Sequence, residues 1–412
     1  MSASRAFLAP FRVRSFRFQW PADLATSWAF EMEALILGWY ILSTTGSVQQ
    51  LVVFGALAWL GSVFSPFFGV AGDRFGFRAL LCGTRGGYAL LSATIAALVL
   101  SDALRPWHLF TIAAIAGLMR PSDMVMRNVL VGQTMRPDML MGALGIARTT
   151  SDTARIAGAL AGTGGVALLG IGPAYVAVTG LYVLAFVLSL GVAGPAHHAR
   201  PGGFAEALAG LRQAVAYVWH KPDQLGAFSI AFLVNLLAFP FVLGLLPYVA
   251  KEFYAADRSG LGYLAASFAT GALVGSLVLG AARLPMRAGR VMLASAAVWF
   301  VALLLFGQFR SLGVGCALLL VSGFAQSLCM TPLAAVMLRS ASDEMRGRVM
   351  GMRMLAIWGL PLGLLAAGPI IDRWGYPATT LAYAGLGLAA TLAVAYKWQR
   401  ALWHPSAAAN HP

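Results

Sequence analysis

Long apolar segments separated by short polar connections dominate the chain. Twelve of these segments are about as long as the ~20 residues that an α-helix needs to cross the hydrocarbon core of a bilayer. An even number of spans puts both ends of the chain on the same side of the membrane. The expected spans cover residues 20–43, 49–71, 79–100, 106–134, 138–169, 173–194, 223–250, 259–282, 290–309, 312–338, 346–371 and 376–397.

The basic residues of the connections are distributed unevenly between the two sides of the membrane. When the connections are assigned alternately to two faces, one face receives eighteen Arg and Lys residues and the other receives five. Short cytoplasmic loops carry an excess of these residues, so we expect the basic face, with both termini, in the cytoplasm. One missed or extra span would scramble this distribution, and the clean split therefore supports the count.

The composition is typical of an integral membrane protein. Of the 412 residues, 59% are hydrophobic and 11% are charged, whereas a soluble domain carries about 25% charged residues. The mean hydropathy is +0.76. A net charge of +14 could indicate nucleic-acid binding, but the basic residues cluster in short loops, so we expect no nucleic-acid partner. Residues 1–18 lack the apolar core and cleavage site of a signal peptide and are expected to form a tail.

The longest connection, residues 195–222, divides the chain into two halves of six spans. The expected domains are an N-terminal bundle, residues 1–194, and a C-terminal bundle, residues 223–412. Apolar residues recur at helical spacing between Phe204 and Val218 within the connection. This pattern predicts an amphipathic helix on the cytoplasmic surface, with a plain linker as the alternative.

A charged, glycine-rich turn joins the second and third spans. Glycines permit a sharp reversal of the chain, and charged side chains next to a membrane must lie near water or be paired. The spacing G-x-x-x-D-R-x-G recurs at Gly368–Gly375, after the eleventh span, which indicates three-helix units repeated in inverted topology. The residues of the turn that carry the motif are Gly69, Gly72, Asp73, Arg74, Gly76 and Arg78.

This turn resembles the signature loop between helices 2 and 3 of the major facilitator superfamily. Further stretches are similar to the branch that includes enterobactin exporters and macrolide efflux pumps, namely Phe16–Arg17, Phe30–Ala34, Gly38–Tyr40, Thr45–Ser47 and Arg346–Gly351. The resemblance implies an all-α membrane protein of twelve helices in two six-helix bundles with inverted three-helix repeats. It also implies alternating access and proton-driven export of the multidrug type.

The resemblance has implications for two particular sites, the turn at Asp73 and the fifth span. For Asp73 it implies a gate, in which the carboxylate meets the N-terminal end of helix 11 near Arg346–Met350, together with Arg74 and Arg78. The alternative is a solvated turn. Antiporters of this superfamily usually carry a Gly-Pro pair in helix 5, where this chain has Gly158-Ala159-Leu160-Ala161-Gly162. That departure leaves the direction of transport open.

Ionisable residues inside the spans concentrate in the N-terminal half. Each costs about 2.5–3.5 kcal/mol on insertion scales, so such residues are functional candidates. Helical rise puts Asp123 at the depth of Arg148, and Arg120 at the depth of Asp152. We therefore predict two ion pairs between spans four and five, either as a fixed scaffold or in contact with substrate or proton. The network in these two spans comprises Arg120, Asp123, Arg127, Arg148, Asp152 and Arg155.

The first span holds three acids, Asp23, Glu31 and Glu33. Glu31 and Glu33 lie near the middle of the span but point about 200° apart on the helix. A carboxyl group caught between a low-dielectric cavity and an arginine can gain or lose its proton as the cavity opens to each side. We therefore expect Glu31 or Glu33 to couple transport to protons. The alternative is that one of them is an ion-pair partner of Arg120 or Arg127.

Aromatic and amide side chains inside the spans are candidates for a substrate cavity, because apolar and aromatic walls suit amphipathic ligands. In membrane proteins such residues more often pack helices or face lipid. The candidates are Trp28, Phe30, Tyr40, Asn235, Phe239 and Gln326.

The favoured function is a proton-coupled secondary transporter of the cytoplasmic (inner) membrane that exports small amphipathic molecules, drug-like or siderophore-like. One alternative is uptake or facilitated diffusion of a metabolite or organic anion. Another is a non-transporting signalling or partner protein. No P-loop is present, and the six histidines lie almost entirely in tails and loops, so we expect no enzyme, no cofactor and no metal. Expected partners are a small-molecule substrate, protons and the bilayer. The sequence does not determine the oligomeric state, and a monomer is the working expectation.

Overall fold

A computed structural model describes residues 9–194, 204–281, 288–342 and 345–403. All regular secondary structure in these ranges is helical. The N-terminal half begins with a short turn, η1 (Ala9–Arg12), and its helices follow the first six predicted spans. They are α2 (Arg14–Thr45), α3 (Val48–Leu57), η2 (Leu60–Phe64), α4 (Ser65–Phe75), α5 (Phe77–Leu100), α6 (Pro106–Thr134), α7 (Pro137–Leu169) and α8 (Ile171–Ser189).

The predicted helix between the halves is confirmed as α9 (Phe204–His220). In it Ala214 and Val218 are buried, whereas Arg212 and Val215 are exposed, so the helix has an inner and an outer face. The C-terminal helices that follow are α10 (Pro222–Leu237), α11 (Phe239–Leu243), α12 (Leu246–Tyr248), η3 (Val249–Phe253), α13 (Arg258–Ala281), α14 (Ala288–Phe306), α15 (Leu312–Arg339), α16 (Arg346–Leu355), η4 (Ala356–Trp358), α17 (Gly359–Lys397) and α18 (Gln399–Trp403).

Seven helices of the described chain are individually long and apolar enough to cross a membrane. The last of them, Arg348–Lys397, contains two predicted spans, because Gly375 leaves the helical conformation within α17. The second and seventh predicted spans are each divided into shorter helices, and the first and fifth each contain several charged residues. The helices are therefore consistent with twelve spans, although the sixth ends at Ser189 rather than 194.

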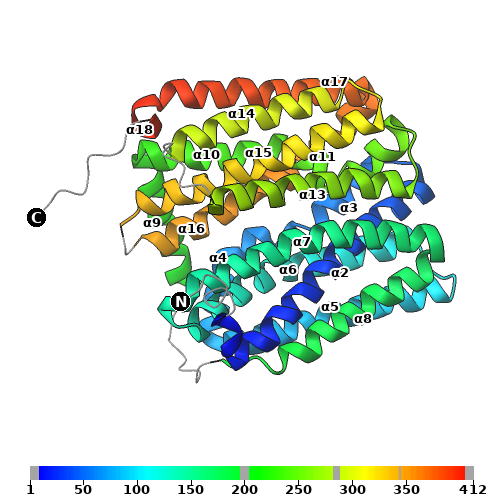
Figure 1. Ribbon diagram of the computed structural model, residues 1–412, viewed down its shortest axis with the longest axis horizontal. Helices are drawn as coiled ribbons and strands as arrows, with labels where there is room; N and C mark the ends of the chain where they lie inside the picture. The colour runs from blue at the N-terminus through cyan, green and yellow to red at the C-terminus, as the bar shows by residue number, and fades with distance from the viewer. Residues whose placement is uncertain (1–8, 195–203, 282–287, 343–344, 404–412) are drawn as a thin grey trace, which may run out of the picture.

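The long helices form two groups (Figure 1). One group contains α2, α5, α6, α7 and α8, and the other contains α10, α13, α14, α15 and α17. The groups meet where α7 packs against α13 and where α3 packs against α17. Buried apolar residues surround Trp299 and Phe300 in the C-terminal half and Tyr88 and Tyr182 in the N-terminal half. We propose that these groups are the two domains expected on either side of residues 195–222.

The repeated glycine spacing corresponds to a repeated turn of the backbone. Gly76 and Gly375 have positive φ angles of 89° and 78°, a region that glycine enters without a Cβ penalty. Each turns the chain directly into the next helix, α5 in the first case and the second part of α17 in the other. The second turn also contacts the N-terminal half, because Asp372 accepts a hydrogen bond of 2.7 Å from Gln49 of α3.

Candidate functional site

A cavity lies between the two groups of helices. Its N-terminal wall comes from α2, α3, α6 and α7, and its C-terminal wall from α11, α12 and α13. The space that protein atoms leave free, including open solvent at the mouth, is about 1320 Å³. The two walls differ in character. Charged side chains on the N-terminal wall include Glu31, Glu33, Arg120 and Arg155, and the facing wall consists of apolar residues and glycine.

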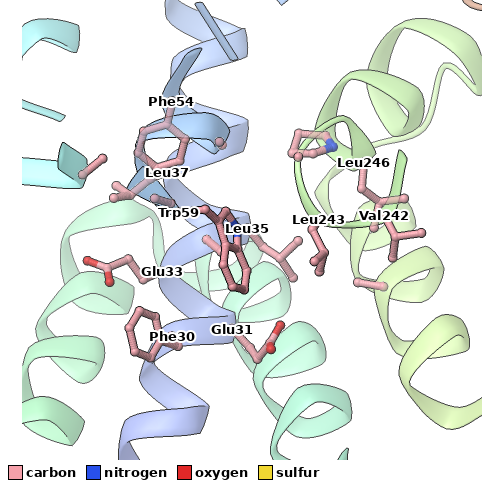
Figure 2. A pocket seen from close by; sticks show the side chains of 18 of the residues that line it. Phe30, Glu31, Glu33, Leu35, Leu37, Phe54, Trp59, Val242, Leu243 and Leu246 are labelled. Atoms are coloured by element: carbon pink, nitrogen blue, oxygen red, sulfur yellow. The ribbon is translucent and has the colours of Figure 1, made fainter. Parts of the chain in front are cut away.

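Glu31 and Arg155 form an ion pair on the cavity wall. Nε of Arg155 lies 3.2 Å from Oε1 of Glu31, and the two side chains are 31% and 28% exposed. Figure 2 shows Glu31 pointing toward Leu243 across the cavity. A single contact of this kind in a partly open site can be exchanged for a contact with a proton or a ligand.

Two glycines of α7 allow this pair to form. A Cβ atom added to Gly158 would lie 2.9 Å from Cβ of Glu31, and one added to Gly162 would lie 2.9 Å from Cα of Met32. Both distances are shorter than packed side chains tolerate, so α7 and α2 approach each other closely only because these positions lack side chains. Gly158 lies one turn after Arg155 and thereby brings Arg155 next to Glu31. These glycines belong to the segment that departs from the Gly-Pro pattern.

Glu33 faces away from Glu31, as the helical angle predicts (Figure 2). Its carboxylate accepts hydrogen bonds from the hydroxyl groups of Tyr175 and Tyr182 in α8, the latter at 2.6 Å. Both tyrosines are buried. The polar atoms of Glu33 are therefore occupied by the protein, although the residue lines the cavity.

Arg120 of α6 is the remaining charged residue of this wall. Its guanidinium carbon lies 4.4 Å from the ring centroid of Phe30 and 4.0 Å from that of Trp59. Trp59 is in this position because the second span is interrupted between α3 and η2. Cation–π contacts of this type stabilise a guanidinium group over a ring face.

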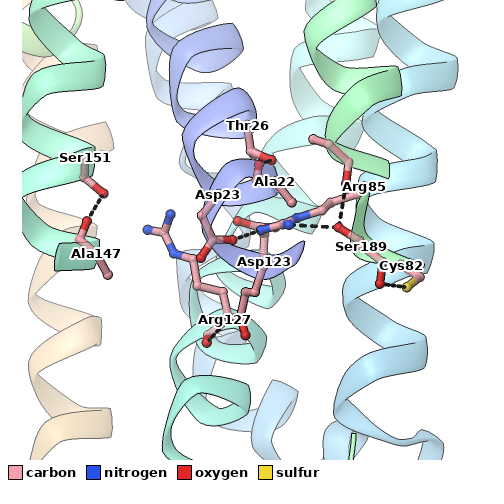
Figure 3. A network of polar contacts seen from close by, with 12 residues as sticks. Ala22, Asp23, Thr26, Cys82, Arg85, Asp123, Arg127, Ala147, Ser151 and Ser189 are labelled. Atoms are coloured by element: carbon pink, nitrogen blue, oxygen red, sulfur yellow. Dashed lines mark hydrogen bonds and ion pairs between the residues drawn. The ribbon is translucent and has the colours of Figure 1, made fainter. Parts of the chain in front are cut away.

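A second charged cluster lies outside the cavity (Figure 3). Arg85 of α5 donates to Asp23 of α2, to Asp123 of α6 at 3.0 Å, and to Oγ of Ser189 in α8 at 2.8 Å. The side chain of Arg85 is 1% exposed, and those of Asp23 and Asp123 are 10% and 4% exposed. This Asp23–Arg85–Asp123 cluster joins four helices of the N-terminal half. None of its members lines the cavity, so the structure separates Asp23 from the other two acids of the first span.

The predicted pairing between spans four and five was wrong for the residues that can be compared. Asp123 pairs with Arg85, and Arg120 stacks on Phe30 and Trp59. Equal depth does not make two helices neighbours: α6 packs mainly against α5, whereas α7 packs against α2 and α13. The carboxylate of Asp152 accepts a hydrogen bond of 3.2 Å from Ser276 of α13.

The three other members of the predicted network lie in different places: Arg127 lies near the Asp23–Arg85–Asp123 cluster, Arg155 lines the cavity, and the side chain of Arg148 is not described. Arg127 lies beside Asp23 (Figure 3), with which it interacts electrostatically, and its carbonyl oxygen accepts a hydrogen bond of 2.8 Å from Gln19. Neither Arg120 nor Arg127 is the ion-pair partner of Glu31. That partner is Arg155. The side chain of Arg148 lies outside the described residues.

Five of the six aromatic and amide candidates do not line the cavity. Phe30 does, and the other residues have their own packing or hydrogen bonds. Tyr40 donates to the carbonyl of Leu104, and Asn235 to that of Ala231. Residue type alone cannot distinguish a cavity wall from the interior of a bundle. The remaining three are Trp28, Phe239, which packs edge-on against Trp299 at 4.9 Å, and Gln326, which is 5% exposed.

The glycine-rich turn joins α4 to α5 as predicted. A Cβ atom added to Gly72 would lie 2.3 Å from the ring of Phe77, so the turn requires glycine there. Arg78 donates to the carbonyl of Leu190 at 2.7 Å and so satisfies the end of α8. Gly69 lies within α4, Arg74 is exposed at its end, and α4 contacts α16. The side chains of Asp73 and Arg346 lie outside the described residues, so the expected gate stays a prediction.

Sequence reasoning missed Tyr175, Tyr182 and Trp59. Tyr175 and Tyr182 stand seven residues apart in an otherwise apolar span. That spacing puts both hydroxyl groups on one helix face, so it could have indicated a buried polar partner. Trp59 had no comparable signal, because nothing in the apolar run around it marks the break between α3 and η2.

Comparisons with known proteins agree with this architecture. A family model described as Major Facilitator Superfamily matches residues 228–409. The multidrug efflux pump Tap of Mycobacterium tuberculosis is 29% identical over 363 residues, which cover 84% of this chain and 84% of that protein. Tap of Mycolicibacterium fortuitum is 29% identical over 179 residues, or 42% of each chain.

Solved structures show the same fold. The POT family transporter PepTSo has a TM-score of 0.73 at 13% identity, covering 95% of this chain and 98% of that one. The nucleoside transporter NupG has a TM-score of 0.70 at 13% identity, covering 93% and 99%. The human organic anion transporter MFSD10 has a TM-score of 0.66 at 17% identity, covering 92% and 99%. The family match over residues 228–409, the similarity to Tap and the shared fold agree, and this chain resembles the major facilitator superfamily in sequence and in fold.

Proposed function

We propose that this transporter exports small amphipathic molecules in exchange for protons by alternating access. The observation that carries the proposal is the cavity between the halves, where the Glu31–Arg155 pair faces an apolar wall. An apolar wall opposite a small number of polar groups suits a ligand with one apolar and one polar part. The relatives named multidrug efflux pumps support export.

Glu31 is the proposed coupling residue. A proton that binds its carboxylate removes the charge that holds Arg155, and loss of that proton restores the ion pair. Because the pair lies in the cavity, a proton and a substrate compete for the same wall, which is the requirement for exchange. Glu33, whose oxygens are held by Tyr175 and Tyr182, has a supporting role.

The proposed orientation and gate follow from the charges of the connections. We place the chain in the cytoplasmic (inner) membrane, with both termini, α9 and the turn at Asp73 on the cytoplasmic side, because the basic connections lie on that side. Asp73 closes the cytoplasmic gate by meeting the positive N-terminal end of α16. The contact between α4 and α16 supports this proposal.

The test is accumulation of ethidium, a fluorescent lipophilic cation, in everted vesicles energised by a proton gradient. The parent chain and the variants Glu31→Gln, Glu33→Gln and Glu252→Gln are compared. Glu252 is an exposed acid outside the cavity, so it controls for loss of a carboxylate. We expect accumulation that collapses with the gradient, that is lost in Glu31→Gln and that persists in Glu252→Gln. Gradient-driven accumulation that survives in Glu31→Gln would contradict the proposal.

A second candidate, facilitated diffusion of an organic anion, is favoured by one observation. Two arginines, Arg120 and Arg155, line the cavity. The two functions differ in proton movement: an exchanger changes the pH inside vesicles when substrate is added, and a facilitator does not. A pH-sensitive dye trapped in vesicles therefore separates them, and a non-transporting protein shows neither substrate movement nor pH change.

A further inference from the structure

Arg120 differs from the other cavity arginine and from the cluster arginine in its partners. Arg85 is bonded to two carboxylates, and Arg155 to one. Among the described residues, no carboxylate pairs with Arg120 and no oxygen accepts a hydrogen bond from it. Its contacts are the rings of Phe30 and Trp59. The electrostatic influence of Glu31 and Glu33 reaches it, but Oε1 of Glu31 is bonded to Arg155 and both oxygens of Glu33 are bonded to tyrosines.

Ring contacts leave the binding capacity of this side chain unused. Neither ring supplies an oxygen acceptor, so the five N–H donors of the guanidinium plane have no oxygen partner among the described residues. A guanidinium removed from bulk water without a carboxylate partner is costly, so an anion that reaches these donors is stabilised. The two rings also hold the plane in place before a ligand arrives, which reduces the entropy lost on binding.

We infer that Arg120 binds an anionic group of the substrate, so that the preferred substrates are aromatic amphiphiles carrying a carboxylate. This inference rests on the proposed transport of small molecules through the cavity and names their class. The fork of an arginine matches the two oxygens of a carboxylate. The apolar wall opposite, with Val242, Leu246 and Phe268, receives the aromatic body.

Two dyes that differ only at one carboxylate provide the test. Rhodamine 110 carries a free carboxylate, and rhodamine 123 is its methyl ester. Equilibrium binding to the purified chain in lipid nanodiscs is measured by fluorescence anisotropy, without any gradient. We expect the parent to bind rhodamine 110 about tenfold more tightly, as for a hydrogen bond to a charged group. Arg120→Gln should remove that preference and change rhodamine 123 binding less than about twofold.

Two further variants keep the test decisive. Glu31→Gln releases Arg155 to the same wall, so rhodamine 110 should bind more tightly, a gain that misfolding cannot produce. Arg310→Gln is the matched control, because Arg310 is exposed and stacks on Phe253 at 5.7 Å away from the cavity lining. It should leave both affinities unchanged.

The inference is overturned if the parent binds the ester as tightly as the acid, or if Arg120→Gln weakens both dyes equally. Should Arg120→Gln fail to fold, Arg120→Lys takes its place, because lysine keeps the charge but lacks the planar fork, and an undiminished preference for rhodamine 110 in that variant overturns the inference. Because no gradient is used, failure of proton coupling in vesicles would leave this result intact. Conversely, coupled transport without a carboxylate preference would reject the inference and retain the proposed function.

Discussion

Two carboxylate–guanidinium sites in the same half of the molecule have opposite designs. In the Asp23–Arg85–Asp123 cluster, one arginine is 1% exposed and bonds two carboxylates and a serine hydroxyl. In the Glu31–Arg155 pair, one contact of 3.2 Å joins two side chains that are each about a third exposed. Every strong interaction of the cluster is internal to the protein, whereas the pair faces a cavity.

The difference shows how a membrane protein can contain charges for two purposes. A buried charge needs a complete set of partners, and removing one partner leaves the others uncompensated. That requirement makes the Asp23–Arg85–Asp123 cluster a rigid connection between helices. The Glu31–Arg155 pair lines the cavity and is partly exposed. Loss of the pair therefore costs little folding stability, and its charge is available for exchange. We therefore expect mutations of the two sites to separate stability from transport.

The largest expected effect on stability follows from removing the centre of the cluster. Arg85→Gln leaves Asp23 and Asp123 without their cation, and loss of one partner of a buried ion pair costs about 3–5 kcal/mol. The measurement is thermal unfolding of the purified protein in detergent, together with its yield. Arg155→Gln is the comparison, with an expected loss of at most about 1 kcal/mol for a partly exposed pair. Equal losses in the two variants would remove the distinction between the sites.

The next effect concerns the contact that positions the pair. Gly158→Ala adds a methyl group 2.9 Å from Cβ of Glu31, and overpacking of this kind costs about 1–3 kcal/mol. Because α2 must move away, the pair with Arg155 lengthens and gradient-driven accumulation falls. Gly164→Ala in the same helix meets no atom within 4 Å and is the control. Normal transport in Gly158→Ala would show that the close approach is unnecessary.

A smaller effect is expected at Glu33. Tyr182→Phe removes one of the two hydroxyl donors to its carboxylate, and a buried hydrogen bond contributes about 1 kcal/mol. Thermal unfolding should reveal this loss, while gradient-driven accumulation continues. Tyr263→Phe, at an exposed tyrosine, serves as the matched control. Loss of coupled transport at normal stability would instead identify Glu33 as the coupling acid.

The smallest effect is expected where the repeated turn meets the other half. Gln49→Ala removes the exposed hydrogen bond to Asp372. At the surface such a bond is expected to contribute about 0.5 kcal/mol or less to folding stability. The midpoint of thermal unfolding should hardly move, and Gln50→Ala, next to it and also exposed, should match it. A clear difference in transport rate between these two variants would assign the Asp372 contact a part in gating.

The spans were predictable because the bilayer imposes their length, and the α6 range of 106–134 matches the apolar pattern. The angle of 200° between Glu31 and Glu33 was also predictable from helix geometry alone. Which helices adjoin one another was not. Depth from the membrane surface paired Asp123 with Arg148, but the helix that supplies its partner is α5, with Arg85. Sequence position carries no information about that neighbour.

The cavity was the least predictable feature. Its lining depends on helix breaks, at Trp59 between α3 and η2 and at Gly244 between α11 and α12. Such breaks bring one aromatic residue into the cavity and leave another, such as Phe239, inside a bundle. Both residues are aromatic and stand in apolar segments, so composition does not distinguish them. Family resemblance identified the architecture, and the structure alone identified Arg155 as the partner of Glu31.

We propose that the Glu31–Arg155 pair couples transport to protons while the Asp23–Arg85–Asp123 cluster only supports the fold. The most direct measurement is proton release per substrate moved, in proteoliposomes containing equal amounts of folded parent, Glu31→Gln or Glu252→Gln protein. We expect substrate-dependent proton release in the parent and in Glu252→Gln, and substrate movement without proton release in Glu31→Gln. Proton release by Glu31→Gln at the parent's ratio would contradict it.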